Sequence, residues 1–320
     1  MIVTILFALT SQPLQAGYLF KNGKLIDEKF IASLPLEEHY ALGIKALKAK
    51  NWQEAALQFR IVTINFPQAA RSREAYYFLG VCLYHEGDED TANDNFNKYL
   101  RVESSPKYFE ETFQYKLAIA NAFKNGARKH LFGFEKMPRV FQSRTHALEI
   151  YDEIIGALPN HELAAKALMG KAQVLLQKER YRECIEAYQT VIRKFPKTEY
   201  AAKSYSSISE VFLKQSNCEL QNPDILALAQ INAKKFAQDF PRDENVQQSQ
   251  DKISEMKELL AQELYETGRL YERKKEPGAS VLYYQAAIDE YPNTKVAQKC
   301  QERLQSLQKY IPKTDETHVQ

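Results

Sequence analysis

The chain has 320 residues, with 43 lysines and arginines against 41 aspartates and glutamates, so its formal net charge is +2. Because nucleic-acid binding needs a concentrated basic face, this balance argues against DNA or RNA as the main partner. The sequence holds no glycine-rich phosphate loop, no nucleophile-elbow motif, no His-Glu-x-x-His motif and no Cys/His set with zinc spacing. We therefore expect no enzyme, no cofactor and no metal site.

The N-terminal residues predict a secretory signal peptide over 1–16. Residues 1–9 are mostly apolar, and the small residues Ala16 and Gly17 follow them, as at a signal cleavage site. The apolar run is too short to span a bilayer. The alternative is an apolar N-terminus on a cytoplasmic protein. Because the first cysteine is Cys82, the segment offers no thiol for lipid attachment, and lipidation is not expected. Residues 17–35 are predicted to form an extended N-terminal segment.

A repeated phrase, an aromatic residue followed by proline, closes successive amphipathic stretches. A small residue stands twelve positions before each proline, and an aromatic residue stands eight positions before most of them. The phrase occurs as Phe66-Pro67, Phe195-Pro196, Phe240-Pro241 and Tyr291-Pro292, with Leu158-Pro159 as a near match. Proline cannot continue a helix, so each phrase predicts the end of a helix and of a repeat unit.

Glycine or alanine precedes the small residue by another twelve positions at Gly43, Gly80, Ala172 and Gly268. This spacing within a unit of about 34 residues is the tetratricopeptide (TPR) pattern of paired antiparallel helices. We predict an all-α protein: a right-handed superhelical solenoid of about six TPR helix pairs over residues 36–312, with a C-terminal capping helix and a flexible tail at 313–320. No strand pattern is recognised anywhere in the chain.

The predicted units follow one another with two interruptions. They cover 36–69, 73–106, 111–159, 163–196, 199–241 and 261–292, and a final amphipathic run at 295–311 suits the capping helix. The insertions fall at 124–146 in the third unit and at 215–224 in the fifth. A solenoid of this kind presents grooves that bind partners and seldom holds an active site.

Two faces are predicted to bind partners. The inward face of the first helix in each of the first two units forms an aromatic and aliphatic groove suited to an extended peptide or a partner helix. Its predicted residues are Tyr40, Ile44, Leu47, Tyr77, Val81, Tyr84 and His85. The alternative is that some of these side chains pack against the neighbouring helix. In the sixth unit the equivalent C-terminal face is polar and charged, with Tyr265, Arg269, Glu272 and Arg273.

The insertion at 124–146 is a third candidate contact region. It combines six lysines or arginines with aromatic residues, and Leu131, Phe132, Gly133 and Phe134 stand at its centre. Long insertions in repeat proteins often map to a functional face. The alternatives are a flexible loop and a loop that folds back onto the solenoid. Binding of nucleic acid by so short a basic segment is not favoured in a chain of balanced charge.

The cysteines are interpreted as structural. Cys184 occupies the close-packed small position of its unit, and Cys82 follows Val81 within a helix, where cysteine behaves as a small apolar residue. Cys218, in the polar stretch of the fifth unit, is the cysteine expected to be exposed.

Three segments resemble the BamD family (also called YfiO or ComL), the TPR subunit of the machinery that assembles β-barrel proteins in the outer membrane. They are the first unit from Tyr40 to Pro67, the insertion followed by Ala147-Leu148-x-x-Tyr151, and the stretch from Leu260-Ala261 through Tyr265 and Tyr271 to Tyr291-Pro292-Asn293-Thr294.

The resemblance implies a periplasmic scaffold associated with the inner face of the outer membrane without spanning it. Its implied partners are the barrel-forming Bam subunit, other envelope assembly proteins and unfolded outer membrane protein segments. The chain departs from the family in lacking the lipid-modified cysteine and in having about one repeat more. The alternatives are a periplasmic TPR adaptor of the Tol-Pal or cell-division type and a cytoplasmic TPR chaperone.

Overall fold

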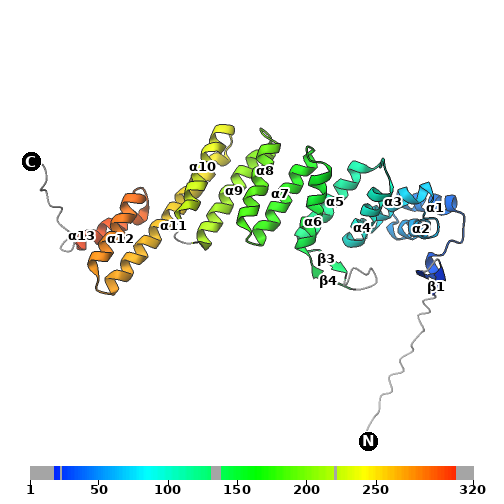
Figure 1. The fold of residues 1–320 in the computed structure, drawn as a ribbon, viewed down its shortest axis with the longest axis horizontal. Helices are drawn as coiled ribbons and strands as arrows, with labels where there is room; N and C mark the ends of the chain where they lie inside the picture. Colours follow the sequence, from blue (N-terminus) through cyan, green and yellow to red (C-terminus); the bar gives the residue numbers. More distant parts are fainter. Residues whose placement is uncertain (1–17, 22–23, 131–137, 220–221, 308–320) are drawn as a thin grey trace, which may run out of the picture. The chain divides into compact units, whose positions relative to one another are not determined.

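The computed structural model describes residues 18–21, 24–130, 138–219 and 222–307. Its residues form two compact units, 1–146 and 147–320, and each is described by itself. The predicted signal peptide at 1–16 and the predicted tail at 313–320 lie outside the described residues. Within the described ranges, the structure has thirteen α-helices, one short 3-10 helix and four short strands (Figure 1).

The first unit begins with a small hairpin and continues as paired helices. In chain order its elements are β1 (Tyr18–Lys21), β2 (Lys24–Asp27), η1 (Glu28–Phe30), α1 (Leu36–Lys48), α2 (Trp52–Asn65), α3 (Ala70–His85), α4 (Glu89–Val102), α5 (Phe109–Lys124), β3 (Arg128–His130) and β4 (Arg139–Gln142). The amide of Asn65 donates to the carbonyl of Phe30 at 2.7 Å, which ties the η1 segment to α2.

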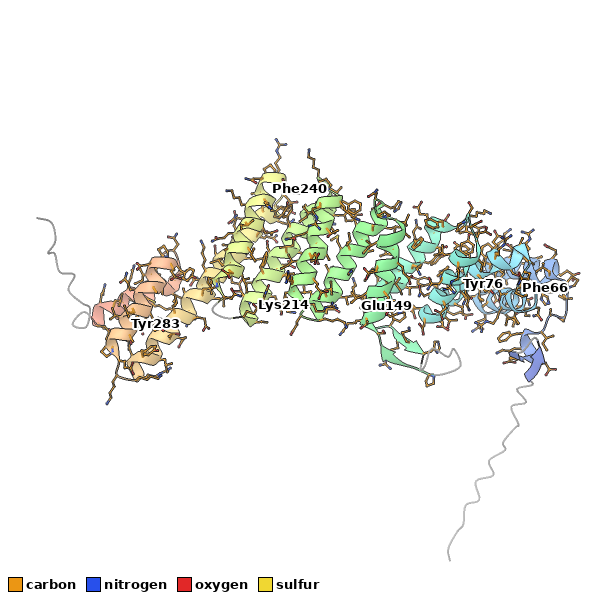
Figure 2. All side chains as sticks on the ribbon, viewed as in Figure 1. Phe66, Tyr76, Glu149, Lys214, Phe240 and Tyr283 are labelled. Carbon is orange, nitrogen blue, oxygen red and sulfur yellow. The ribbon has the colours of Figure 1, made fainter. Side chains whose placement is uncertain are left out.

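The second unit contains the remaining helix pairs. Its elements are α6 (Arg144–Ala157, which starts just before the unit boundary), α7 (Glu162–Gln177), α8 (Tyr181–Lys194), α9 (Glu199–Cys218), α10 (Pro223–Asp239), α11 (Asn245–Arg273), α12 (Pro277–Glu290) and α13 (Lys295–Ser306). Figure 1 shows α7, α8 and α9 side by side in chain order. Lys214, in the last turns of α9, and Phe240, the residue after the last residue of α10, lie at opposite ends of these two antiparallel helices (Figure 2).

The predicted all-helical, TPR-like solenoid fold is confirmed, and the repeated phrase has the predicted role. Phe66, Phe195, Phe240 and Tyr291 are each the residue at which the second helix of a pair ends. Their amides still bond to the last helical turn, and the proline that follows has no amide to extend the ladder.

The recurring glycines have a specific reason. A Cβ atom on Gly43 would lie 2.9 Å from Phe59, one on Gly80 would lie 2.8 Å from Phe96, and one on Gly268 would lie 2.6 Å from Tyr284. In each pair the aromatic ring of the second helix fills the space that the glycine leaves on the first helix. The sixteen-residue spacing from glycine to aromatic therefore sets how closely the two helices approach.

The turns inside the helix pairs also follow one pattern. Lys50, Gly87, Glu179 and Lys275 have φ between 56° and 73°, in the left-handed region, and each directly precedes the residue that caps the second helix. A left-handed residue after a helix lets the chain reverse while the last carbonyls stay hydrogen bonded. Only one of the four is glycine, so this feature of the turns could not be recognised from glycine positions.

The prediction that the chain contains no strands is wrong in two places. β1 pairs antiparallel with β2, and β3 pairs antiparallel with β4. The first hairpin had a sequence signal, because Asn22-Gly23 stands between two short runs of strand-forming residues. The second hairpin lies within the insertion predicted at 124–146 and gives that insertion regular structure at its base.

The later interruptions are largely helical. α9 continues to Cys218, four residues into the polar stretch predicted at 215–224, and α10 starts at Pro223. α11 is 29 residues long and begins at Asn245, well before the predicted start of the sixth unit at 261. α11 packs on α9, α10, α12 and α13. Val246 near its start packs against the cluster that contains Tyr205 and Phe236, and Gly268 near its end faces Tyr284 of α12, so one helix serves two successive pairs. The predicted capping helix is α13.

Candidate protein-binding surfaces

The predicted groove lies in the first compact unit, residues 1–146, and contains a buried aromatic cluster. The Tyr77 ring stacks on Tyr108 with centroids 4.3 Å apart, and it contacts Tyr99 at 5.5 Å and Phe96 at 6.0 Å. The Tyr40 ring contacts Phe59 at 5.9 Å. Burial raises the pKa of Tyr77 and of Tyr40. These rings join α1, α3 and α5 and the helices paired with them.

The seven predicted groove residues therefore divide into two groups. Tyr40, Tyr77 and Val81 are buried, which matches the alternative that such positions pack against a neighbouring helix. The other four retain accessible surface: Ile44, Leu47 and Tyr84 are half-buried, and His85 is exposed. Among these seven residues, accessible aromatic surface is kept at the end of α3, by Tyr84 and His85.

An aromatic stack at that end was not anticipated. Trp52, the first residue of α2, stacks on His85 with centroids 4.1 Å apart and planes inclined by 13°. Tyr84 and Tyr115 meet nearby at 5.3 Å. Partial burial, with the positive charge of Lys50, lowers the pKa of His85. A neutral imidazole beside an indole offers a flat, weakly polar surface on which apolar or aromatic side chains can rest.

A charged rim borders the buried cluster. The Tyr40 hydroxyl donates to the Glu74 carboxylate, and the Arg71 guanidinium lies 4.7 Å from the Tyr40 ring centre. Arg71 also pairs with Glu37 at 3.4 Å, and Lys107 pairs with Glu74 at 3.9 Å. The rim alternates in sign and shows no strong preference for an acidic or a basic ligand.

The predicted C-terminal face forms a connected network. Arg269 donates to the Tyr265 hydroxyl at 3.4 Å, and the Tyr265 ring contacts Tyr284 of α12 at 5.6 Å. The Tyr284 hydroxyl donates to Glu272 at 2.8 Å, and Arg303 of α13 pairs with the same carboxylate. Arg273 is exposed at the end of α11. Tyr265, Arg269 and Glu272 are therefore brought together.

The network holds its charges in fixed positions. Burial by itself would raise the pKa of Glu272, but the hydrogen bonds from Arg303 and Tyr284 outweigh it and lower that pKa below its usual range. Arg303 was not anticipated, because it lies in the capping helix, 31 residues after Glu272. The face therefore places Arg269 and Arg303 near the Glu272 carboxylate, and Arg273 is exposed at the end of the same helix as Arg269.

The base of the insertion is anchored to the second repeat. The backbone amide of His130 in β3 donates to the Asp90 carboxylate at 3.2 Å, and the Nε2 atom of the His130 ring lies 3.1 Å from the Asp88 carboxylate. Lys129 pairs with Asp90 at 3.5 Å, and His146 lies 3.9 Å from Asp90. Asp88 also caps α4. The predicted contact residues Leu131, Phe132, Gly133 and Phe134 lie outside the described residues.

None of the helices in the described ranges has both the length and the apolar character needed to cross a bilayer. Over those same residues, no group of three or more His, Cys, Asp or Glu side chains is arranged to hold a metal ion.

Comparison with known families identifies the repeats. Residues 40–108 match one tetratricopeptide repeat family model, and residues 166–198 match another. These two segments, which together cover less than half of the chain, are therefore similar to tetratricopeptide repeats. TPR domains mediate contacts between proteins and are generally non-catalytic scaffolds.

Three solved structures that are similar to the chain are distant from it in sequence. A TPR repeat protein from Bacteroides fragilis is 15% identical, with 85% of this chain and 99% of that chain covered and a TM-score of 0.41. MamA from Desulfovibrio magneticus is 17% identical, with 68% of this chain and 97% of that chain covered and a TM-score of 0.39. PilF from Pseudomonas aeruginosa is 14% identical, with 84% of this chain and 97% of that chain covered and a TM-score of 0.33. At such values these likenesses assign no function. No curated protein sequence matches the chain significantly.

Proposed function

We propose that this protein is a non-catalytic scaffold of the bacterial cell envelope that supports the assembly of β-barrel proteins into the outer membrane, in the manner of BamD. The observation that carries the proposal concerns the last helix pair, α11 and α12. There the segment that resembles the family, residues 260–294, folds into α11 and α12, and it carries Tyr265, Arg269 and Arg273. The likeness in sequence and the predicted contact face therefore fall on the same helices.

The chemistry of this face suits an acidic partner surface. Arginine is enriched at protein interfaces because its planar guanidinium makes several hydrogen bonds while its stem packs against apolar groups. Arg269 rests on Tyr265 and Arg303 is held by Glu272, so two of the three arginines are already ordered. Ordering before binding reduces the entropy lost on association. We propose that the barrel-forming Bam subunit binds here.

The first compact unit, residues 1–146, is proposed to bind unfolded segments of outer membrane proteins. Such segments alternate apolar and polar residues, because barrel strands face lipid on one side. The Trp52 and His85 stack and the half-buried Tyr84, Ile44 and Leu47 offer apolar surface for the apolar residues. The adjoining charged rim offers polar partners for the alternate residues. Other envelope assembly proteins are proposed to bind elsewhere on the scaffold.

The proposal requires the periplasm, at the inner face of the outer membrane, with attachment through protein partners. Mass spectrometry of the mature N-terminus tests this directly. Removal of residues 1–16 is expected, and an intact N-terminus on a protein found in the cytoplasm would contradict both export and the proposed function. That second result is the one expected of a cytoplasmic TPR chaperone.

The partner is tested by co-purification from membranes. The double substitution Arg269→Glu and Arg273→Glu should abolish recovery of the barrel-forming subunit with the full chain. Arg182→Glu, which reverses an exposed arginine on α8, serves as the control and should leave recovery unchanged. Recovery of a Tol-Pal component in place of any Bam subunit would overturn the proposal.

The aromatic-Pro-x-Thr phrase of this chain does not favour the Tol-Pal alternative. In Phe195-Pro196-Lys197-Thr198 and Tyr291-Pro292-Asn293-Thr294, the threonine caps the next helix. Its hydroxyl donates to the carbonyl of the aromatic residue, at 2.6 Å for Thr198 and 2.8 Å for Thr294. The phrase stops one helix and starts the next, so it reports on the fold and carries no information about the partner.

A further inference from the structure

A groove in the second unit lies outside the surfaces described so far. Its floor is the face of α9 that carries Tyr205, Ile208 and Phe212, and its walls are α8 and α10. The cavity volume is about 270 Å³. This is slightly below the range of roughly 300–1,000 Å³ typical of small-molecule pockets, so the groove suits protein side chains better than a free ligand.

The wall formed by α10 exposes apolar side chains beside this cavity. Leu228 is 51% exposed and Ile231 is 53% exposed, and the two stand three residues apart on one face of the helix. Ile192 on α8 is half-buried on the opposite wall. Single exposed apolar residues are ordinary, but this pair adjoins an apolar hollow, so the two side chains extend the apolar surface of the groove.

The groove is held in shape by polar contacts beneath it. The Asn232 amide donates to the Tyr205 carbonyl and to the Ser209 hydroxyl, both at 3.0 Å. The Tyr205 hydroxyl donates to Asp239 at 2.7 Å, and its ring stacks on Phe236 with centroids 5.4 Å apart. These contacts fix α10 to α9, so a partner would meet a preformed surface.

The charge of the groove indicates what it binds. Arg193 contributes a cation from the α8 wall and Lys235 contributes one from the α10 wall, while none of the residues that line the cavity carries a carboxylate. Arg193 donates one hydrogen bond to Thr190, and a guanidinium has five donors, so others remain for a ligand. The groove therefore joins an apolar centre to a positively charged rim.

We propose that this groove binds an amphipathic helical segment of a partner protein that carries two apolar anchors, three or four residues apart, flanked by aspartate or glutamate. The anchors fill the hollow between Ile192, Leu228 and Ile231, and the carboxylates pair with Arg193 and Lys235. This is the helix-in-groove mode of recognition, in which spaced apolar residues give affinity and flanking charges fix the register. The site is independent of the C-terminal face proposed for the Bam subunit.

The test selects ligands without assuming a partner. A displayed library of 16-residue helix-forming peptides is selected on the full chain, with counter-selection on Ile231→Glu. Enriched peptides should carry the paired apolar residues with acidic flanks. Their affinity, measured by fluorescence anisotropy, should fall about tenfold or more in Ile231→Glu, as when an interface anchor is lost. Because Ile231 is exposed, the substitution should leave the circular dichroism spectrum unchanged.

Charge reversal tests the second half of the proposal. The double variant Arg193→Glu and Lys235→Glu should bind the acidic peptide weakly and should bind its counterpart with lysine flanks instead. Val102→Glu and Arg182→Glu, which alter an exposed apolar residue and an exposed arginine elsewhere, are the matched controls and should leave both affinities unchanged.

Several results would overturn the proposal. They are failure of the library to yield binders sensitive to Ile231→Glu, enrichment of basic flanks, and equal binding by the charge-reversed variant. Self-association of the wild-type chain that Ile231→Glu abolishes would assign the groove to a second copy. A gain in peptide affinity on deletion of residues 308–320 would assign it to the C-terminal segment of the same chain.

Discussion

Trp52 and His85 stack with their ring centroids 4.1 Å apart and their planes inclined by 13°, which joins the start of α2 to the end of α3. Trp52 is the single tryptophan of the chain, so its fluorescence reports on this contact without interference from another indole. The stack lies beside the accessible aromatic surface at the end of α3, and the protonation state of His85 affects what that surface can bind.

The first prediction concerns pH. Because burial and Lys50 lower the pKa of His85, tryptophan fluorescence should fall on acidification with a midpoint below about 6.5, the ordinary histidine value. The lowered pKa means that the unfolded chain binds this proton more tightly, so the stability due to neutral His85 is present above about pH 6.5 and is lost as pH falls through the folded pKa. His85→Gln should remove the transition, and a midpoint at or above 6.5 would contradict the prediction.

The second prediction tests the glycine and aromatic pairs. Gly80→Ala places a methyl group where a Cβ would lie 2.8 Å from the buried Phe96 ring, so it should lower the free energy of unfolding by about 1–3 kcal/mol. Gly156, near the end of α6, has no atom within 4 Å of such a Cβ. Gly156→Ala should therefore raise that free energy by up to about 1 kcal/mol. The urea concentrations at which the two variants and the wild type are half unfolded test both expectations. Equal shifts of this midpoint in the two variants would rule out the steric explanation.

The third prediction concerns the C-terminal network. Glu272→Gln keeps the shape of the side chain but removes the charge that pairs with Arg303, so it should destabilise the protein by about 1 kcal/mol at neutral pH. The lowered pKa of Glu272 means that the stabilisation is present above the ordinary carboxylate pKa and is lost as pH falls through the lowered value. The difference between variant and wild type in thermal unfolding should thus shrink in acid. A difference that persists in acid would indicate that packing, not charge, is responsible.

The fourth prediction concerns thiol reactivity. Cys218 is exposed, as its place in the polar stretch predicted, whereas Cys82, Cys184 and Cys300 are buried. Burial raises the pKa of Cys82 and of Cys184 to about 12 and that of Cys300 to about 11, so their thiols stay protonated at neutral pH. Iodoacetamide should modify one thiol of the native protein, and Cys218→Ser should abolish that modification. Rapid labelling of the folded Cys218→Ser variant would refute the assignment.

The fifth prediction concerns the anchor of the β3–β4 hairpin. His130→Ala removes the contact with Asp88 and should speed hydrogen exchange in the hairpin while leaving α4 protected. Asp88→Ala removes the same contact and also the cap of α4, so it should lose about 1 kcal/mol more of global stability. Exchange measured by mass spectrometry separates the two effects. Identical behaviour of the two variants would show that the cap contributes nothing.

Much of the fold could be predicted because repeat proteins are stabilised by contacts between neighbours in sequence. The sixteen-residue interval from Gly43 to Phe59 places both residues in one helix pair, and the proline at position 67 marks its end. The hairpins were missed because each strand is only three or four residues long, too short for an alternating pattern to stand out.

The candidate surfaces were less predictable because accessibility depends on residues distant in the sequence. Tyr77 has the register of a groove residue, but Tyr108, which belongs to no repeated position, stacks on it and helps to bury it. Arg303 joins the C-terminal network from the capping helix, and the groove below Leu228 and Ile231 exists only where α8 and α10 both flank α9.

The spacing, caps and helix ends that define the helix pairs are local and recur with each repeat, so the amino-acid sequence was enough to predict paired helices with tetratricopeptide spacing. Which of the many aromatic and charged side chains remain available to a partner emerged with the packing of the helices. The physical reason is that exposure is a property of the packed neighbours: a ring that one helix presents is covered or left open by another helix, whose side chains follow no repeat.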